Sequence, residues 1–272
     1  MNRWRSVTSV VSVGLYVLLW APLVVVVVFS FNASKLGVSW GGFTLDGYVA
    51  LGRNEAALAA ARNTAVLALL STALSTVIGT LLGYGLSRGG GKGRRGLGRD
   101  VWVDRMLQVP VLVPDVVFAV ALVLGFAAAR LWLWFLEPGL PLMVLGQVSF
   151  QIPFVALVVR ARARRLDPRW EEAARDLGAT PAAAFFRVTL PMLRPGVVAG
   201  ALLALTLSLD DFAVSFFLSG PGSTTLPVLI YSNARRGLTP DIHALSTLLL
   251  AGTMAAVLLG GWWRPRSQSR TH

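Results

Sequence analysis

Long apolar runs separated by short polar segments dominate the pattern of hydrophobic and polar positions along the chain. A bilayer core of about 30 Å needs roughly 20 apolar residues of helix. Six segments reach that length, at approximately 9–31, 63–87, 106–129, 140–160, 194–219 and 243–263. The pattern therefore predicts an all-α, polytopic membrane protein with six transmembrane helices, in which residues 1–272 form one transmembrane domain.

Proline residues interrupt several of these spans, at Pro22, Pro110, Pro114, Pro141 and Pro153. The bilayer tolerates such breaks where neighbouring helices or a water-filled path satisfy the freed backbone groups. A bundle around a path is therefore indicated, rather than six independent anchors. The first run resembles a signal peptide, but it is too long and lacks a small-x-small cleavage site, so we expect it to remain as a span.

Composition and charge agree with this arrangement. Hydrophobic residues make up 55% of the 272 residues and charged residues only 14%, which does not fit a soluble protein. The formal net charge is +12, and 19 of the 25 Lys and Arg residues fall near the two termini or in the segments 88–105 and 160–194. The positive-inside rule therefore places both termini and these two segments in the cytoplasm, which requires an even number of spans.

The sequence offers little material for covalent chemistry. It has no Cys and only two His, which excludes a disulfide framework and a thiolate metal site. No nucleophile–base pair is evident, and the glycine-rich run 89–93 lacks the Ser or Thr that follows the lysine of a phosphate-binding loop. We therefore predict a chain that is not an enzyme and holds no cofactor or metal, with a membrane-embedded enzyme or a signalling anchor as alternatives.

The loop 161–193 carries the signals of two short cytoplasmic helices. Asp167 is suited to an N-cap, and Gly178 can adopt the left-handed conformation that ends a helix. Thr180-Pro181 repeats the start signal, and Pro191 is expected to end the second helix. A DNA-binding helix-turn-helix fits less well, because a loop tethered to the bilayer at both ends can hardly enter a major groove. We expect no nucleic-acid partner.

The same loop resembles the EAA loop of ABC-importer permeases. The family pattern is Glu-Ala-Ala, three residues, Gly, nine residues, Ile, any residue, Leu-Pro. Here it reads Glu172-Ala173-Ala174, Gly178 and Val188-Thr189-Leu190-Pro191, with Val in place of Ile. In that family a short coupling helix sits in a cleft of the ATP-hydrolysing subunit. The resemblance implies that ATP and Mg are bound by a partner ABC ATPase dimer, and that the coupling residues are Glu171, Glu172, Ala173, Ala174, Gly178, Leu190 and Pro191.

Three acidic residues lie at membrane depth. Asp115 comes early in the third span, and Asp210 and Asp211 are adjacent in the fifth. A carboxylate within a span costs about 2.5 to 3.5 kcal/mol on insertion scales, so it normally faces a path, and a cationic substrate is the simplest reason for it. Adjacent side chains point about 100° apart on a helix, so at most one of the pair is expected to face the path fully.

We assign Asp115, Asp210, Asp211 and Phe212 to the candidate substrate path. The ring of Phe212 could also face a cation. A structural pairing remains the alternative for either carboxylate of the pair in the fifth span, and a capping or hinge role remains the alternative for Asp115. For His243, near the outer end of the sixth span, a hydrogen-bonded packing role is preferred to titration.

Further segments are similar to the spermidine/putrescine permeases of the PotC type. They are Ser208-Leu209-Asp210-Asp211-Phe212, the loop 220–227, Ile230-Tyr231-Ser232 and the segment 239–247, where His243 replaces a more frequent Asn. The resemblance implies a polyamine importer of the bacterial inner membrane. Its other parts would be a second homologous permease subunit, the ATPase dimer and an extracytoplasmic solute-binding protein. An importer of ferric iron, thiamine or another solute remains open, because the EAA loop is shared.

Overall fold

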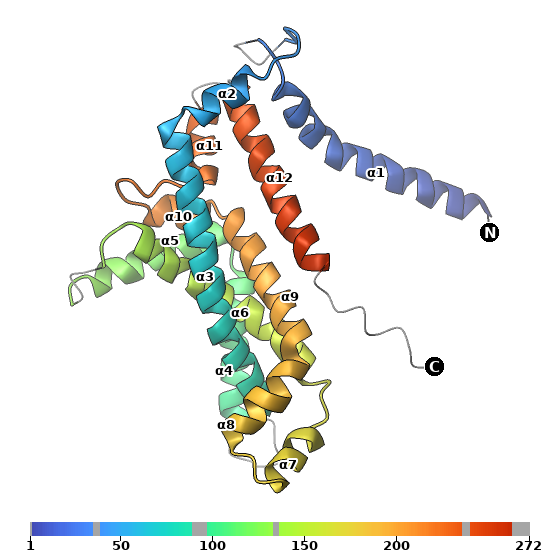
Figure 1. Cartoon of the computed structure of the whole chain (residues 1–272), viewed down its shortest axis with the longest axis vertical. Helices are drawn as coiled ribbons and strands as arrows, with labels where there is room; N and C mark the ends of the chain where they lie inside the picture. The colour runs from blue at the N-terminus through green and yellow to red at the C-terminus, as the bar shows by residue number, and fades with distance from the viewer. Residues whose placement is uncertain (1, 35–38, 89–96, 133–135, 236–239, 263–272) are drawn as a thin grey trace. The chain divides into compact units, whose positions relative to one another are not determined.

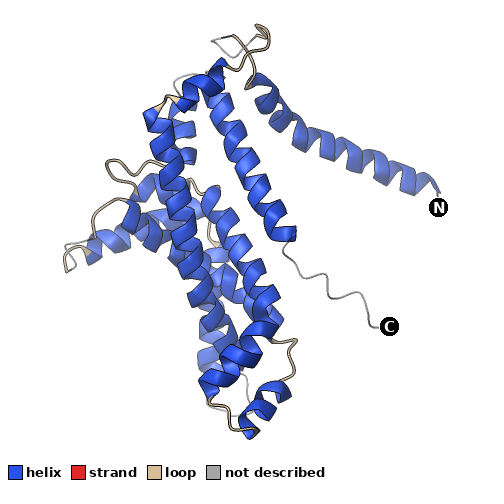
Figure 2. Ribbon diagram, viewed as in Figure 1, coloured by secondary structure: helices blue, strands red, loops and turns tan. Residues whose placement is uncertain are grey.

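The computed structural model describes residues 2–34, 39–88, 97–132, 136–235 and 240–262. Within these ranges the regular structure is helical, and extended backbone pairs only at an isolated bridge between Asn32 and Phe43 (Figures 1 and 2). The predicted all-α class is confirmed. The glycine-rich run 89–93 lies outside the described residues, as do the last basic residues of the chain, Arg264, Arg266 and Arg270.

Four helical stretches of the described chain are long and apolar enough to cross a bilayer. They are Val11–Phe29 within α1 (Asn2–Phe29), α3 (Glu55–Arg88), α6 (Leu140–Ala163) and the run Pro181–Leu209. A fifth span results if α4 (Leu97–Leu112) and α5 (Asp115–Ala129), which are bent by 115° relative to each other, are counted together. A membrane protein with several spans is thus confirmed, whereas the count of six and the cytoplasmic termini stay predictions.

The shorter helices occupy the connections. They are α2 (Asp46–Gly52), α7 (Arg169–Asp176), α8 (Pro181–Ala184), the π-helical turn η1 (Phe185–Thr189), α10 (Ala213–Leu218) and α11 (Leu226–Ala234). Two longer helices complete the order, α9 (Leu190–Leu209) and α12 (Pro240–Trp262), the latter with the apolar segment Ile242–Ala255. In Figure 1, α7 and α8 lie at one end of the long helices α3 and α9.

The chain divides into two compact units, and whether residues 1–272 act as one transmembrane domain stays a prediction. One unit comprises Met1–Ala61 and Leu226–Gly252. Its core contains Leu51, Ala57, Ala244 and Leu245. The side chain of Asn32 holds the loop after α1 together, since it donates to the carbonyl of Ser39 and accepts from the amides of Ser34 and Gly41.

His243 belongs to the core region of this first unit. Its side chain is buried, and its ring centroid lies 6.0 Å from that of Phe29. Within the described part of the chain, its Nε2 has no hydrogen-bond partner. A packing role is therefore supported, but the hydrogen bond that we expected is not made through Nε2.

The second unit comprises Arg62–Thr225 and Thr253–His272, and small residues set the spacing of its long helices. A Cβ atom on Gly83 of α3 would lie 2.4 Å from the carbonyl oxygen of Ala156 in α6. Cβ atoms on Gly79 and on Gly200 of α9 would lie 2.7 and 3.0 Å from side-chain atoms of Val155. Helices in a bilayer associate through such close contacts, because lipid supplies no hydrophobic driving force between them.

Candidate functional site

Helix α7 has the two ends that the sequence predicts. Oδ1 of Asp167 accepts a hydrogen bond of 2.9 Å from the amide of Arg169, so this carboxylate caps the first turn. At the other end, the amides of Gly178 and Ala179 donate back to carbonyl groups of the last turn, which is a Schellman motif. Gly178 has φ +89°, the left-handed conformation expected from the sequence.

The second helix begins at Thr180, as predicted, but the prediction that Pro191 ends it is wrong. Oγ1 of Thr180 accepts a hydrogen bond of 3.2 Å from the amide of Ala183. The chain then continues through the π-helical turn η1 into α9, so a single helical run extends from Pro181 to Leu209. Pro153 in α6 and Pro195 in α9 likewise lie inside helices, which membrane-spanning helices tolerate where the freed backbone groups find other partners.

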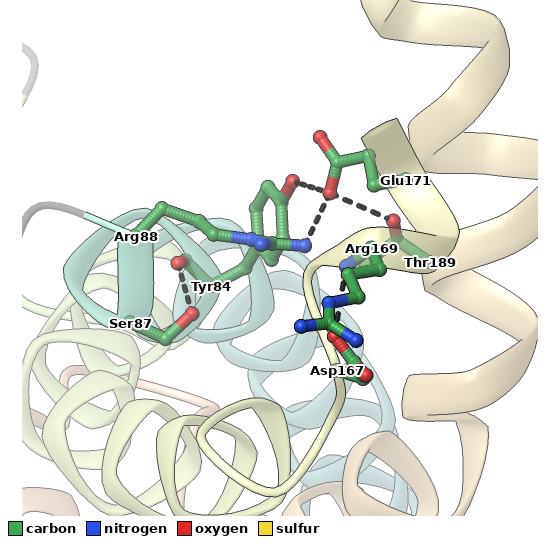
Figure 3. Close-up of polar contacts among 7 residues, drawn as sticks. All are labelled: Tyr84, Ser87, Arg88, Asp167, Arg169, Glu171 and Thr189. Carbon is green, nitrogen blue, oxygen red and sulfur yellow. Dashed lines mark hydrogen bonds and ion pairs between the residues drawn. The ribbon is translucent and has the colours of Figure 1, made fainter. Parts of the chain in front are cut away.

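Glu171 is the predicted coupling residue of α7 whose side chain connects this helix to the bundle. Its Oε2 accepts hydrogen bonds from the hydroxyl of Tyr84 at 2.7 Å, from Nη2 of Arg88 at 2.5 Å and from Oγ1 of Thr189 at 3.1 Å (Figure 3). The contact with Arg88 is an ion pair, and the Glu171 side chain is only 19% exposed. One carboxylate oxygen therefore joins α7 to the C-terminal end of α3 and to η1.

The other predicted coupling residues lie at or near the surface. Exposed are Glu172, Ala173, Gly178 and Pro191, whereas Ala174 and Leu190 are half-buried. An apolar pocket of about 390 Å³ is lined by Phe186, Leu190, Pro191, Arg194 and Val197. The loop thus leaves most of its family pattern accessible to another molecule.

An exposed apolar stripe follows one face of α7. Trp170 is 61% exposed and Leu177 is 90% exposed. Together with Ala173 they are spaced three and four residues apart, which places them on the same side of a helix. Large apolar side chains gathered on a surface usually mark a place that another protein covers. We define Trp170, Ala173 and Leu177 as the α7 stripe.

The fifth predicted span, 194–219, is interrupted at its two acids. Helix α9 ends at Leu209, and α10 begins only after the segment Asp210–Phe212. The expectation that Asp210 and Asp211 lie about 100° apart on one continuous helix is therefore wrong. No Gly or Pro occurs between residues 201 and 219, so the usual signals of a helix break are absent from this segment.

Asp211 holds this break in place. One carboxylate oxygen accepts from the amide of Val214 at 3.2 Å, and the other accepts from the amide and the hydroxyl of Ser215 at 2.9 and 2.7 Å. The second oxygen also accepts from Nε2 of Gln147 in α6 at 3.1 Å. An anionic group at the start of α10 also interacts favourably with the helix dipole. The carboxylate of Asp211 thus stabilises the helix break, and its place in the substrate path stays a prediction.

A buried polar network extends from Asp211 into the bundle. Oε1 of Gln147 accepts hydrogen bonds from Ser71 of α3, at 3.0 Å, and from Ser208 of α9. One turn further along, Oε1 of Gln151 accepts from Ser75 at 2.9 Å, and its Nε2 donates to Ser71 at 3.3 Å. All of these glutamine and serine side chains are buried, so the network fixes how α3, α6 and α9 meet.

Reasoning from the sequence missed this network. Its signal was present, because Gln147 and Gln151 are four residues apart in one apolar span, and Ser71 and Ser75 are four apart in another. Uncharged polar residues on one face of a transmembrane helix indicate a contact with a neighbouring helix.

The two remaining acids of the predicted path are exposed. Asp115 is the first residue of α5, directly after the bend, and Asp210 follows the last residue of α9. The half-buried ring of Phe212 stacks on that of Phe216 with centroids 5.2 Å apart. Of the candidate acids, Asp115 and Asp210 are therefore the accessible pair.

Comparison with known proteins identifies the class. Residues 79–270 match the family described as the binding-protein-dependent transport system inner membrane component. The chain belongs to this family, and it is therefore a membrane permease subunit of an ABC importer, in which the ATPase is a separate subunit.

Two polyamine permeases are similar in sequence to this chain over nearly its whole length. The putrescine transport system permease protein PotI of Escherichia coli (strain K12) is 38% identical over 264 residues, 96% of this chain and 90% of the relative. The spermidine/putrescine transport system permease protein PotC of the same strain is 35% identical over 245 residues, 90% of this chain and 89% of the relative. The resemblance to the PotC-type permeases is confirmed.

Solved structures with a similar fold come from other ABC transporters. A chain of the bacterial alginate ABC transporter, in complex with an alginate pentasaccharide-bound periplasmic protein, has a TM-score of 0.77 at 20% identity, covering 100% of this chain and 97% of the other. A chain of the inward-facing MetNI methionine ABC transporter has a TM-score of 0.61 at 20% identity, covering 74% and 90%. At these identities the likeness establishes the fold alone.

Proposed function

We propose that the chain carries a polyamine such as putrescine or spermidine across the bacterial inner membrane. Relatives named for these solutes are 38% and 35% identical to it over nearly its full length. The observation that carries the proposal is the accessible pair Asp115 and Asp210, placed where two helices are interrupted. A polyamine has two or more positive charges, and it needs acceptors that replace part of its hydration without holding it too tightly.

The break itself adds to this negative charge. Asp210 follows the C-terminal end of α9, where unpaired carbonyl groups amount to about half an elementary negative charge. Because the carboxylate of Asp211 is occupied by hydrogen bonds, the proposal assigns contact with the substrate to Asp210 and Asp115, and support of the break to Asp211.

The proposed complex contains four kinds of subunit. This chain, with six spans and both termini in the cytoplasm, pairs with a second homologous permease, and an extracytoplasmic solute-binding protein delivers the polyamine. An ABC ATPase dimer, which binds the ATP and Mg, receives the α7 stripe. Closure of the dimer moves α7, and the permease pair then shifts between outward-open and inward-open packings.

Uptake of labelled putrescine into proteoliposomes that hold the complete complex tests this proposal. We expect Asp210→Asn to lower uptake about tenfold or more, because an exposed charge is removed while size and hydrogen bonding stay similar. Glu137→Gln, which neutralises another exposed acid, is the matched control and should import normally. Wild-type uptake by the double variant Asp115→Asn/Asp210→Asn would refute the assignment, and transport of thiamine or ferric iron in place of putrescine would refute the substrate.

A further inference from the structure

Helix α7 lies on the bundle without burying a side chain. None of the residues Arg169–Asp176 is buried, and the large apolar groups Trp170 and Leu177 point to the surface. A helix of eight residues is too short to be stable by itself. Its attachment to the rest of the chain therefore depends on its caps and on polar contacts, of which Glu171 makes three.

The three donors to Glu171 come from two different elements. Tyr84 and Arg88 lie one turn apart in the last two turns of α3, and Thr189 ends the π-helical turn that leads into α9. The donors themselves are held firmly. The Tyr84 ring packs against Phe185 with centroids 4.9 Å apart, the Arg88 guanidinium lies 5.6 Å from the Tyr84 ring centroid, and Thr189 is buried.

Helices α3 and α9 connect the Glu171 contacts with the interrupted segment Asp210–Phe212. From Tyr84 to Ser71, α3 rises by about 20 Å as one uninterrupted helix. Ser71 hydrogen-bonds both Gln147 and Ser208, and Gln147 holds Asp211. A displacement of α3 or of α9 at the Glu171 end therefore reaches the break at Asp210–Phe212 through packed helices and buried hydrogen bonds.

We propose that Glu171 is the positioning residue that transmits movement of α7 into α3 and α9. Its neighbour Glu172 faces outward with the accessible part of the family pattern, so the two adjacent glutamates have separate roles. The inference rests on the proposed function, in which the α7 stripe docks on the ATPase. Without the contacts of Glu171, α7 still binds the ATPase, but its movement no longer displaces the helices that carry the acids.

The test measures the amount of putrescine imported per ATP hydrolysed by the complete complex in proteoliposomes. Glu171→Gln removes the ion pair, and Tyr84→Phe removes one donor while the ring keeps its packing on Phe185. A hydrogen bond to a charged group is worth about tenfold in an equilibrium constant. We expect the import per ATP to fall several-fold in both variants, while the ATPase subunit still co-purifies and ATP hydrolysis continues.

A charge reversal controls for general damage. Glu171→Arg alone should uncouple the complex, and Glu171→Arg combined with Arg88→Glu should recover part of the import per ATP. The inference is overturned if the import per ATP of Glu171→Gln stays at the wild-type value, if import and hydrolysis fall in proportion, or if the ATPase no longer co-purifies. Failure of the proposed function is separate from this, because it appears as absent putrescine import by the wild-type complex.

Discussion

The replacement Asp211→Asn tests whether one carboxylate supports the helix break while its neighbour Asp210 meets the substrate, as we propose. One oxygen of Asp211 accepts three hydrogen bonds and the other accepts one, from the amide of Val214. Asn has a single oxygen, so in its best orientation the Val214 amide faces an NH₂ group. One unsatisfied buried donor costs about 1 to 3 kcal/mol. The lost charge at the start of α10 costs about a further 0.3 to 1 kcal/mol.

Asp210→Asn is the matched comparison, because Asp210 is exposed, and exposed substitutions usually change the stability by less than about 0.5 kcal/mol. The assay combines thermal unfolding of the purified complex with putrescine uptake. We expect Asp211→Asn to unfold at a clearly lower temperature, and Asp210→Asn to unfold as the wild type does but import poorly. If Asp211→Asn unfolds as the wild type does and loses uptake as fully as Asp210→Asn, then Asp211 acts on the substrate and our account of the break is wrong.

Three further outcomes are expected. Gly83→Ala should destabilise the permease by about 1 to 3 kcal/mol in thermal unfolding, because its Cβ would meet a backbone carbonyl of α6. A Cβ at Gly85 has open space, so Gly85→Ala should be neutral, and equal stability of the two variants would contradict the packing argument. Gly178→Val should cost about 1 to 2 kcal/mol of backbone strain and lower both import and ATPase stimulation more than Gly178→Asn, since Asn tolerates the left-handed conformation and a β-branched residue does not; equal effects would count against strain. An impermeant thiol reagent should label Pro221→Cys but not Leu177→Cys in intact cells, and the reverse result would invert the predicted topology.

Much of the fold could be predicted from the sequence because the responsible physics is local. The length of an apolar run is enough to show whether its helix can cross the bilayer. The ends of α7 depend on Asp167 and Gly178, and each of these residues acts within one turn of the helix. The same holds for Thr180, whose side chain caps the helix that begins beside it. Each of these signals is complete within a few consecutive residues.

The break at Asp210–Phe212 and the course of the chain past Pro191 could not be predicted in this way. The break is stabilised by Gln147, which is 64 residues away from Asp211 in the sequence. No local pattern could therefore reveal that the carboxylate of Asp211 accepts a hydrogen bond from it. Pro191 is a stop signal in an α-helix of a soluble protein, but in this chain the helical run continues past it, as it does past Pro153 and Pro195. Similarly, Glu171 and Glu172 look alike in the sequence, and the position of α3 distinguishes them.

The hydrogen bond between Thr189 and Glu171 makes the length of the loop after Gly178 important in this chain. Thr189 reaches Glu171 only if the number of residues between Gly178 and Thr189 brings its hydroxyl to the correct side of the helix. Inserting one residue into the α-helical turn α8 would turn Thr189 by about 100° around the helix axis relative to Gly178. In the mechanism that we propose, the length of this stretch therefore matters as much as its residue types, because a changed length would separate Glu171 from Thr189.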